Sequence, residues 1–485
     1  MSIIKKIKNL EKLSRSLEPN AEERAFLLDK VIQYTNAFLE NINTVPAYRA
    51  TTDEGIGLYD PPISEEPIDI DATLNLIIQN VDRPGVNVGS GGYLCFIPGS
   101  GLYHSALADY IAAVTNRYAG VFFASPGAVR MEQMLLRWIA DFIGYPESAA
   151  GDLTSGGSIA NLTGIVTARD ALDLKAKDFE RSVVYLTKQA HHSIEKALRI
   201  AGLKECIKHF IPLDEHYRMN AAALEQAILN DKKTGLNPWL IVAAAGTVDT
   251  GAVDPLNSIA DIAQSHGLWL HVDGAYGGAF ALCDMGKKIL NGLNRSDSMI
   301  IDPHKGLFLP FGTGAVLVKE GANLRRAYHY EASYLQDTEK LASSDEISPA
   351  ELSPELSRHF RGLRLWLPLK LIGVAPFLAA LEEKLLLARY FYEKMQSFDG
   401  FELGPYPDLS IVTYRYLPKR GDVNEFNRQL VHAIQKDGRI FLSSTIIDGK
   451  FTLRLAVLGF RTHLDKVDQA IEILQEKARA LSQEV

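Results

Sequence analysis

The chain has 485 residues, a net charge of −8, and 47% hydrophobic and 23% charged residues. This length allows a large core and predicts two or three structural units, and the acidic balance argues against nucleic acid or an anionic membrane as the main partner. No apolar run is long enough for a membrane span or a signal peptide. Cys95, Cys206 and Cys283 have neither the spacing of a metal site nor that of a disulfide framework. We therefore expect a cytoplasmic protein without a metal.

The first hundred residues predict a helical arm followed by an extended segment. Residues 1–45 predict two helices, the second over 21–42, because apolar residues recur there at helical spacing. The proline-rich stretch 59–67 predicts an extended arm. The apolar helix faces have no obvious partner within one chain, so we expect a homodimer.

Residues from about 100 to 320 alternate helical patterns with short apolar runs. The runs are VVYLT (183–187), HFIPL (209–213), WLIVAAAG (239–246), LWLHVD (268–273), SMIID (298–302) and GAVLVK (314–319). Runs that are apolar at every position predict a mostly parallel sheet buried on both faces. We expect a large α/β domain over residues 101–360, preceded by the arm over 1–100.

The C-terminal part, residues 361–485, predicts a smaller α+β domain. Residues 367–395 predict one long helix, and strand-like runs follow at 409–417, 439–445 and 451–458. Residues 336–357, before this domain, are polar, acidic and interrupted by Pro349 and Pro354. A mobile flap over an active site is one explanation for so long a loop.

The strongest chemical signal is the sequence Asp302-Pro303-His304-Lys305-Gly306, which follows the apolar residues SMII. Partial desolvation at the end of a buried strand favours the uncharged amine that Schiff-base chemistry requires. The alternative is a lysine whose ammonium reaches solvent from the sheet edge.

A second signal is Asp273, which ends the apolar run LWLHVD. A carboxylate at the end of such a strand requires a cation, and a protonated pyridine nitrogen is one that would make its ring an electron sink. A helix N-cap or a metal ligand are the alternatives. The small residues that follow, GAYGG (274–278 apart from Tyr276), suit the close approach of a flat ligand.

Two weaker signals come from TSGGS (154–158) and from Gln189-Ala190-His191. Glycines and hydroxyls before a helix over 159–172 present free N–H groups to a phosphate, although similar loops cap ordinary helices. An imidazole at His191 could stack on a cofactor ring and move a proton, but a structural histidine is the alternative and His192 is adjacent.

These four elements follow the carboxyl ends of predicted strands, where α/β sheets bind ligands. Their order, SGGS, QAH, HVDGAYGG and DPHK, resembles the group II pyridoxal-5′-phosphate (PLP)-dependent decarboxylases of the aspartate-aminotransferase fold (fold type I). These include the aromatic amino-acid, tyrosine, histidine and glutamate decarboxylases. The resemblance extends to the proline-rich arm, to FASPGAVRMEQ (123–133) and to SRHFRGLRLW (357–366).

The resemblance implies that Lys305 holds PLP as an imine, that Asp273 binds the pyridine nitrogen and that His191 stacks on the ring. These three are the expected catalytic residues. The other implied cofactor contacts are Gly157, Ser158, Thr247, Ala275, Asp302 and His304. The segment YLCFIPGSG (93–101) is implied to line the substrate pocket through Phe96, Pro98 and Gly99, and its character, with Phe122, favours a large apolar or aromatic L-amino acid.

Three positions depart from the family pattern. Asp302 stands where the family often has asparagine, and Val248 stands where a second threonine often follows Thr247. No tyrosine lies between Tyr334 and Arg358, where the family's flexible loop usually carries a proton-donating tyrosine. The expected reaction is decarboxylation of an L-amino acid to an amine and CO₂. Because that tyrosine is missing, oxidative deamination to an aldehyde or transamination are alternatives, and a catalytically silent homologue is a third interpretation.

Overall fold

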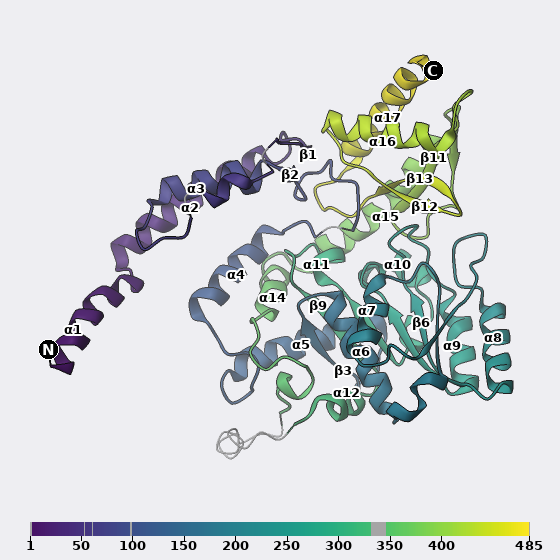
Figure 1. The fold of residues 1–485 in the computed structure, drawn as a ribbon, viewed down its shortest axis with the longest axis horizontal. Coiled ribbons are helices and arrows are strands. Elements are labelled where there is room, and N and C mark those ends of the chain that lie inside the picture. Colours follow the sequence, from purple (N-terminus) through teal and green to yellow (C-terminus); the bar gives the residue numbers. More distant parts are fainter. Residues whose placement is uncertain (1, 53, 61, 98, 331–345, 485) are drawn as a thin grey trace.

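The computed structural model describes residues 2–52, 54–60, 62–97, 99–330 and 346–484. Figure 1 shows a helical arm that projects from a larger body, and a second, smaller sheet with its own helices at the C-terminal end. In the part of the chain so described, no helix is long and apolar enough to cross a membrane.

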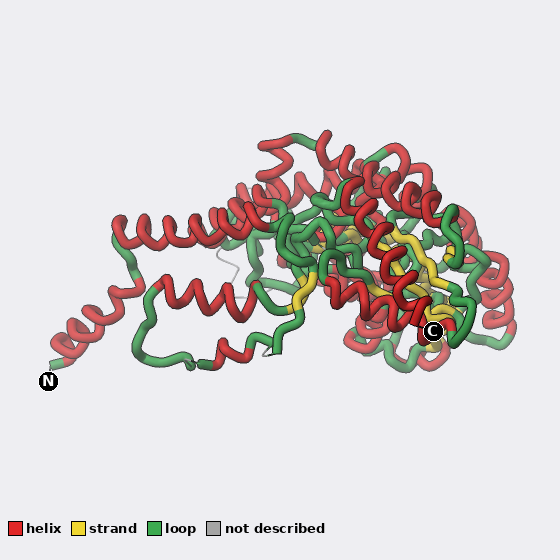
Figure 2. Tube along the Cα trace, turned by 90° about the horizontal axis from the view of Figure 1, so that it is seen from above, coloured by secondary structure: helices red, strands yellow, loops and turns green. Residues whose placement is uncertain are grey.

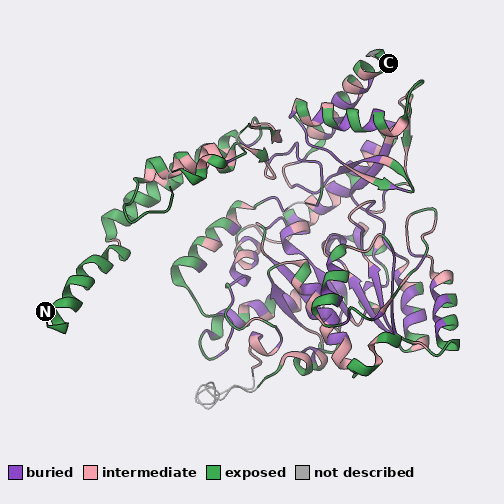
Figure 3. Ribbon diagram, in the orientation of Figure 1, coloured by how far each residue is buried: buried purple, intermediate pink, exposed green. Residues whose placement is uncertain are grey.

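The N-terminal arm consists of α1 (Ile3–Ser14), α2 (Ala21–Asn41) and α3 (Ile70–Ile77), so the two predicted N-terminal helices are confirmed. The first turn of α2 is fixed by a capping box, in which Asn20 accepts from Glu23 N and the Glu23 side chain accepts from Asn20 N. Neither α1 nor α2 contains a buried residue, and both extend away from the body (Figures 2 and 3). Residues 62–69 have no regular secondary structure, and β1 (Tyr48–Arg49) pairs with β2 (Gly85–Val86).

The central sheet has seven described strands in the order β3-β9-β8-β7-β6-β4-β5. They are β3 (Ala150–Thr154), β4 (Ser182–Leu186), β5 (Ile207–Phe210), β6 (Asn237–Ala244), β7 (Trp269–Asp273), β8 (Ser298–Ile301) and β9 (Gly314–Val318). Only β9 among these runs antiparallel to its neighbours, so the prediction of a mostly parallel sheet is confirmed. The sequence did not predict β3, whose AGDLT contains glycine and aspartate, two residue types that are rare in strands.

Both faces of the central sheet are buried. Along β4, Val183 and Tyr185 belong to one hydrophobic cluster, and Val184 and Leu186 belong to another. The first cluster includes residues of α5 (Pro126–Ile143), α8 (Ala221–Lys233) and α9 (Leu256–His266), and the second includes residues of α6 (Gly157–Ala171), α7 (His192–Ile200) and α12 (Gly321–Tyr328). Helices on both faces leave the edges formed by the strand ends as the place for a ligand.

The prediction of one long helix over 367–395 is wrong. The structure has two helices, α14 (Gly362–Ile372) and α15 (Ala375–Gln396). Gly373 lies between them with a φ of +74°, a positive value that glycine adopts without steric cost. Pro376 follows in the first turn of α15, where a proline is tolerated because its missing N–H has no helical partner.

The C-terminal sheet is antiparallel, with the order β10-β11-β13-β12. Its strands are β10 (Phe401–Leu403), β11 (Ile411–Tyr416), β12 (Ser443–Ile447) and β13 (Lys450–Ala456). The helices α16 (Val423–Asp437) and α17 (Leu464–Glu484) share a hydrophobic cluster with β11 and β13. The small α+β unit is confirmed, whereas domain boundaries at residues 100 and 360 stay a prediction.

Candidate active site

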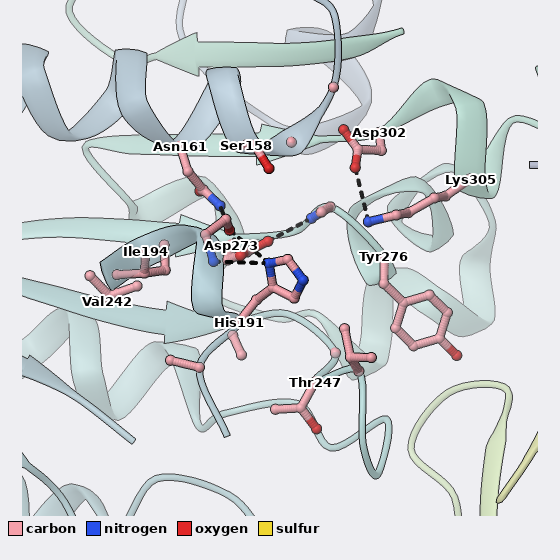
Figure 4. Close-up of a pocket in the computed structure, with 18 of the residues that line it drawn as sticks. Ser158, Asn161, His191, Ile194, Val242, Thr247, Asp273, Tyr276, Asp302 and Lys305 are labelled. Carbon is pink, nitrogen blue, oxygen red and sulfur yellow. Dashed lines mark hydrogen bonds and ion pairs between the residues drawn. The ribbon is translucent and has the colours of Figure 1, made fainter. Parts of the chain in front are cut away.

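A cavity of about 280 Å³ lies at the edge of the central sheet where the parallel strands end. Its lining comes from the segments directly after β3, β4, β6, β7 and β8. The structure brings all nine predicted cofactor-contacting residues to this cavity, several of which are seen in Figure 4. They are Gly157, Ser158, His191, Thr247, Asp273, Ala275, Asp302, His304 and Lys305.

Lys305 lies on a single helical turn, α11 (Pro303–Gly306), immediately after β8. Its Nζ contacts the Asp302 carboxylate (Figure 4). The distance to Asp302 Oδ2 is 2.9 Å, and the Lys305 side chain is 20% exposed. Lys305 therefore lines the cavity and does not extend along the surface. Because Asp302 lies at hydrogen-bonding distance, its carboxylate can accept the proton that the lysine must lose to act as a nucleophile.

Asp302 is buried between two cationic or potentially cationic side chains. Besides Lys305, the Nε2 atom of His304 lies 3.8 Å from Asp302 Oδ2. The Nδ1 atom of His304 is 2.6 Å from the carbonyl oxygen of Thr313, and burial lowers the pKa of His304. Within the described residues, Asp302 Oδ1 is buried without a hydrogen-bond partner. Asp302, which stands where the family often has asparagine, thus contacts Lys305 through Oδ2 alone.

Asp273 is the last residue of β7, and both of its carboxylate oxygens accept hydrogen bonds. Oδ1 accepts from the backbone N–H of Ala275 at 3.1 Å, and Oδ2 accepts from Asn161 Nδ2 at 3.1 Å. The bond to Ala275 shows that Asp273 also stabilises a local turn, but Asp273 is not a helix N-cap, because the next helix, Gly277–Leu282, is capped by Tyr276. A carboxylate has further lone pairs, so Asp273 can still bind a cation in the cavity.

His191 is the N-cap of α7, and its ring lines the cavity (Figure 4). Its Nδ1 accepts from the backbone N–H of Ser193 at 3.3 Å and lies 2.7 Å from Ser193 Oγ. Burial lowers the pKa of His191, while the Asp273 carboxylate acts in the opposite direction. The adjacent His192 is exposed and does not line the cavity. Of the two neighbouring histidines, His191 is the one placed for chemistry.

An anion-binding end of the cavity is formed by the start of α6, a helix of 15 residues capped by Gly156 without a side-chain hydrogen bond. Within the described part of the chain, no acceptor bonds the backbone N–H groups of Gly157 and Ser158. A Cβ atom on Gly157 would lie 2.8 Å from Asp302 Oδ2, so glycine is required for this close approach. Free N–H groups at a helix N-terminus suit a phosphate.

The residues of this cavity fit PLP. The Lys305 amine, the Asp273 carboxylate and the free N–H groups at the start of α6 match its aldehyde, its pyridine nitrogen and its phosphate. When bound, PLP supplies a ring that withdraws electrons from the substrate carbon attached to its imine.

The three predicted substrate residues, unlike the predicted cofactor contacts, are not found among the described residues that line the cavity. Phe96 has a φ of +50° and is 54% exposed, and neither it nor Gly99 is among the described residues that line the cavity. A Cβ atom on Gly99 would lie 2.2 Å from the carbonyl oxygen of His304, so this glycine permits close packing against the segment that carries Lys305. Pro98 lies outside the described residues. Their roles in substrate binding stay predictions.

Several residues of the cavity were not predicted from the sequence. Asn161 and Ser193 line it and connect Asp273 with His191. Tyr276 also lines it, and its hydroxyl lies 2.7 Å from Ser410 Oγ of the C-terminal part. A signal for Asn161 was present, because it follows Ser158 by three residues and so lies on the same face of α6.

A lysine, a carboxylate and an anion-binding helix end on one edge of this sheet define a PLP enzyme of fold type I. Residues 61–417 match the pyridoxal-dependent decarboxylase conserved domain. The chain is 34% identical to an aromatic-L-amino-acid decarboxylase of Bacillus atrophaeus over 98% of both chains, and 29% identical to a phenylacetaldehyde synthase of Petunia hybrida over 86% of both. The structure of a tryptophan decarboxylase (TDC) of Oryza sativa with PLP and tryptamine is similar to it with a TM-score of 0.90 and 25% identity, covering 96% of this chain and 99% of that one.

The chain belongs to the pyridoxal-dependent decarboxylase family. Its cofactor is PLP, and it is a carboxy-lyase that acts on an amino acid.

Proposed function

We propose that this protein converts an aromatic L-amino acid to the corresponding amine and CO₂, with Lys305, Asp273 and His191 as its catalytic residues. The observation that carries the proposal is the convergence of these three side chains on one cavity at the carboxyl edge of the sheet. Retention of all three is unexpected in a catalytically silent homologue.

Each proposed role follows from the contacts of the residue. Lys305 provides the amine that binds PLP, and Asp302 accepts the proton that the amine releases. Asp273 keeps the pyridine nitrogen protonated, because an opposite charge favours the protonated form. His191 stacks on the ring and presents its Nε2 to the cavity, since Nδ1 is occupied by Ser193.

The remaining cofactor contacts are proposed at the two ends and the sides of the cavity. Gly157 and Ser158 bind the phosphate through their free N–H groups, and His304 lies beside them. Thr247, whose hydroxyl lies 2.8 Å from that of Thr250, and Ala275 flank the ring.

The aromatic substrate is supported by the names of the relatives, which include an aromatic-L-amino-acid decarboxylase and a tryptophan decarboxylase. Incubation with a panel of the twenty amino acids, followed by identification of the products, tests it. We expect amines from aromatic amino acids. Preferred turnover of glutamate or of a small aliphatic amino acid would overturn the substrate class but not the chemistry.

A second candidate is oxidative deamination to an aldehyde, which is favoured by the absence of tyrosine from residues 335–357. Residues 336–345 of the predicted flap lie outside the described residues, and residues 346–357 are described. Its described end holds Pro349 in a short 3-10 helix, Pro349–Glu351, which is tied to the body by a 3.0 Å bond from Ala350 N to Gly120 O. A relative of the chain is a phenylacetaldehyde synthase.

Without a tyrosine, protonation of the substrate carbon relies on His191, on solvent, or on Tyr330 or Tyr334. Slow protonation gives dioxygen time to react, so that amino acid, O₂ and H₂O give aldehyde, CO₂, NH₃ and H₂O₂. Comparison of amine with peroxide in aerated and oxygen-free buffer decides between the two reactions. Stoichiometric amine without peroxide in air would rule out the aldehyde reaction.

We also propose that the protein works as a homodimer in the cytoplasm. The exposed apolar side chains of α1 and α2, such as Ile7 and Val31, are supporting evidence for the dimer, because such surfaces are rarely left open in monomers. Three free cysteines without a disulfide suit a reducing compartment.

A further inference from the structure

A line of buried hydrogen bonds leads through the sheet toward the cavity. Trp269 Nε1 donates to Ser298 Oγ at 2.8 Å, and Ser298 Oγ lies 2.8 Å from His271 Nδ1. His271 Nε2 in turn lies 2.9 Å from Asn161 Oδ1. The side chains of His271, Ser298 and Asn161 are at most 1% exposed, so no solvent competes for these bonds.

At Asn161 the line divides toward two residues of the site. One hydrogen of Nδ2 goes to Asp273 Oδ2 at 3.1 Å, and the other goes to Ser193 Oγ at 2.9 Å. Ser193 Oγ then lies 2.7 Å from His191 Nδ1. A single amide therefore contacts the carboxylate and, through one hydroxyl, the imidazole.

The carboxylate of Asp273 fixes the direction of every bond in this line. Because an ionised carboxylate only accepts, the NH₂ group of Asn161 must face it and Oδ1 must face His271. His271 then donates from Nε2, and its Nδ1 accepts from the Ser298 hydroxyl. Ser193 accepts from Asn161, so its own hydroxyl hydrogen is free to point to His191 Nδ1.

His271 accepts from the Ser298 hydroxyl at Nδ1 only as a neutral imidazole. Burial lowers its pKa to about 4, so it carries one ring proton under ordinary conditions. A Cβ atom on Gly164 of α6 would lie 2.7 Å from His271 Cε1, which shows how closely the helix encloses the ring. The ring therefore has little freedom to turn away from Asn161.

We propose that Asn161 is a positioning residue, which holds the Asp273 carboxylate and, through Ser193, keeps the ring proton of His191 on Nε2. The proposal rests on the proposed function for the roles of Asp273 and His191. It adds that one amide orients both residues and acts, together with the backbone N–H of Ser193, on the protonation of His191. His191 consequently presents a donor, and not an acceptor, to the cavity.

The tautomer of His191 can be measured directly by nitrogen NMR of the full-length protein labelled with ¹⁵N-histidine, with and without PLP. A His191→Gln variant assigns the signals. We expect the Nδ1 shift of an unprotonated nitrogen in the parent protein, and a mixture of tautomers in Asn161→Ala. The same pure Nε2–H tautomer in Asn161→Ala would overturn the proposal.

A pair of His271 variants separates hydrogen bonding from packing. His271→Gln offers a side-chain amide that can donate to Asn161, whereas His271→Leu cannot. We expect His271→Gln to keep the parent tautomer of His191 and His271→Leu to give the mixture. If both variants gave the same tautomer, the line of hydrogen bonds would not control His191.

Steady-state kinetics on the holoenzyme give a second readout. We expect Asn161→Ala to lower kcat by about 10- to 100-fold, the range found when hydrogen bonds that orient metal ligands are removed, with a smaller change in KM. The matched control is Asn427→Ala, which removes a buried asparagine that bonds Tyr416 in the C-terminal part. It should lower the thermal stability but leave the tautomer and kcat unchanged.

The two proposals fail in different ways. If no amino acid is decarboxylated, the proposed function is wrong, but the tautomer measured without PLP still tests Asn161. If activity is present and the tautomer and kcat do not respond to Asn161→Ala, the positioning role is wrong and the proposed function stands.

Discussion

The side chains of the cavity at the sheet edge have contacts within the chain, whereas many side chains of the N-terminal arm are exposed. At the cavity, Asp273, Asn161 and His191 bond one another and their backbone neighbours within one chain. In the arm, α1 and α2 bury no residue, and Ile3 and Leu13 are each 74% exposed. These three polar side chains are thus paired inside the body, whereas the apolar side chains of α1 and α2 lie exposed along the arm (Figure 3).

This difference indicates what each region needs in order to function. The cofactor-binding part of the cavity is already formed within one chain, because the carboxyl ends of the strands and the start of α6 supply its lining. The arm needs another surface, because an exposed apolar helix face gains free energy only when it is covered. The substitutions below test two expectations. The first is that the cofactor site depends on residues of one chain, and the second is that the arm depends on contact with another surface.

The largest effect is expected from Lys305→Ala. Without the amine no covalent bond to PLP forms, and we expect a fall in kcat on the order of 10⁴-fold or more, as for loss of other covalent catalytic groups. Borohydride reduction followed by mass spectrometry measures the covalent attachment. Lys188→Ala, which changes an exposed lysine near the site, is the matched control. Attachment of PLP to the Lys305→Ala protein at another lysine would show that Lys305 is not the anchoring residue.

Asp273→Asn should have the next largest effect. A neutral amide does not hold a proton on the pyridine nitrogen, so we expect PLP to stay bound while kcat falls by about 10²- to 10³-fold. Absorbance titration with PLP and steady-state kinetics measure the two quantities. Asp231→Asn is the control, since it changes a carboxylate that bonds Tyr185 outside the cavity. Near-normal turnover of Asp273→Asn would reduce Asp273 to a cap of the turn at Ala275.

The sequence alone predicted those features that repeat along the chain or follow directly from a strand. The parallel strands were of this kind, because their apolar runs are visible locally, whereas the residues that line the cavity were named from the ends of these runs together with the family resemblance. The strand β3 was missed because its glycine and aspartate are rare in strands and its place depends on pairing with β9, far along the chain. The break at Gly373 was overlooked although its glycine and the following proline were in view.

The hydrogen bonds around Asn161 were not predictable for a different reason. Asn161, His271 and Ser298 come from α6, β7 and β8, and no local pattern in the sequence shows that they meet. Their contact depends on the order of strands in the sheet and on the close fit of Gly164 against His271. Such contacts can be read only from a folded chain.

A smaller effect is expected in the arm. Leu27 and Val31 are each 40% exposed and lie four residues apart on one face of α2. If this face is covered in a dimer, the change of both to aspartate removes about 3 kcal/mol or more of burial, which weakens association by at least about 10²-fold. Sedimentation over a range of concentrations measures this. Leu229→Asp, on α8 of the body, is the control. A parent protein that is monomeric and fully active at low concentration would contradict the proposed dimer.

The smallest effect concerns the pH dependence of stability through His271. Burial lowers the pKa of His271 to about 4, whereas an unfolded histidine titrates near about 6.5. Since the unfolded state binds the proton more readily, His271 contributes stability that is fully present above the unfolded pKa and is lost as the pH falls toward 4. Over this window its share of the free energy of unfolding should decline by up to about 3 kcal/mol.

His271→Gln cannot take up the proton, so its stability should fall less steeply. Urea unfolding of both proteins between pH 7 and pH 4.5 measures the difference, from which the other titrating groups, such as Asp254, cancel. Parallel pH dependences in the two proteins would mean that His271 takes up its proton as readily in the folded state, and the bond from the Ser298 hydroxyl to His271 Nδ1 would then reverse its direction at acidic pH.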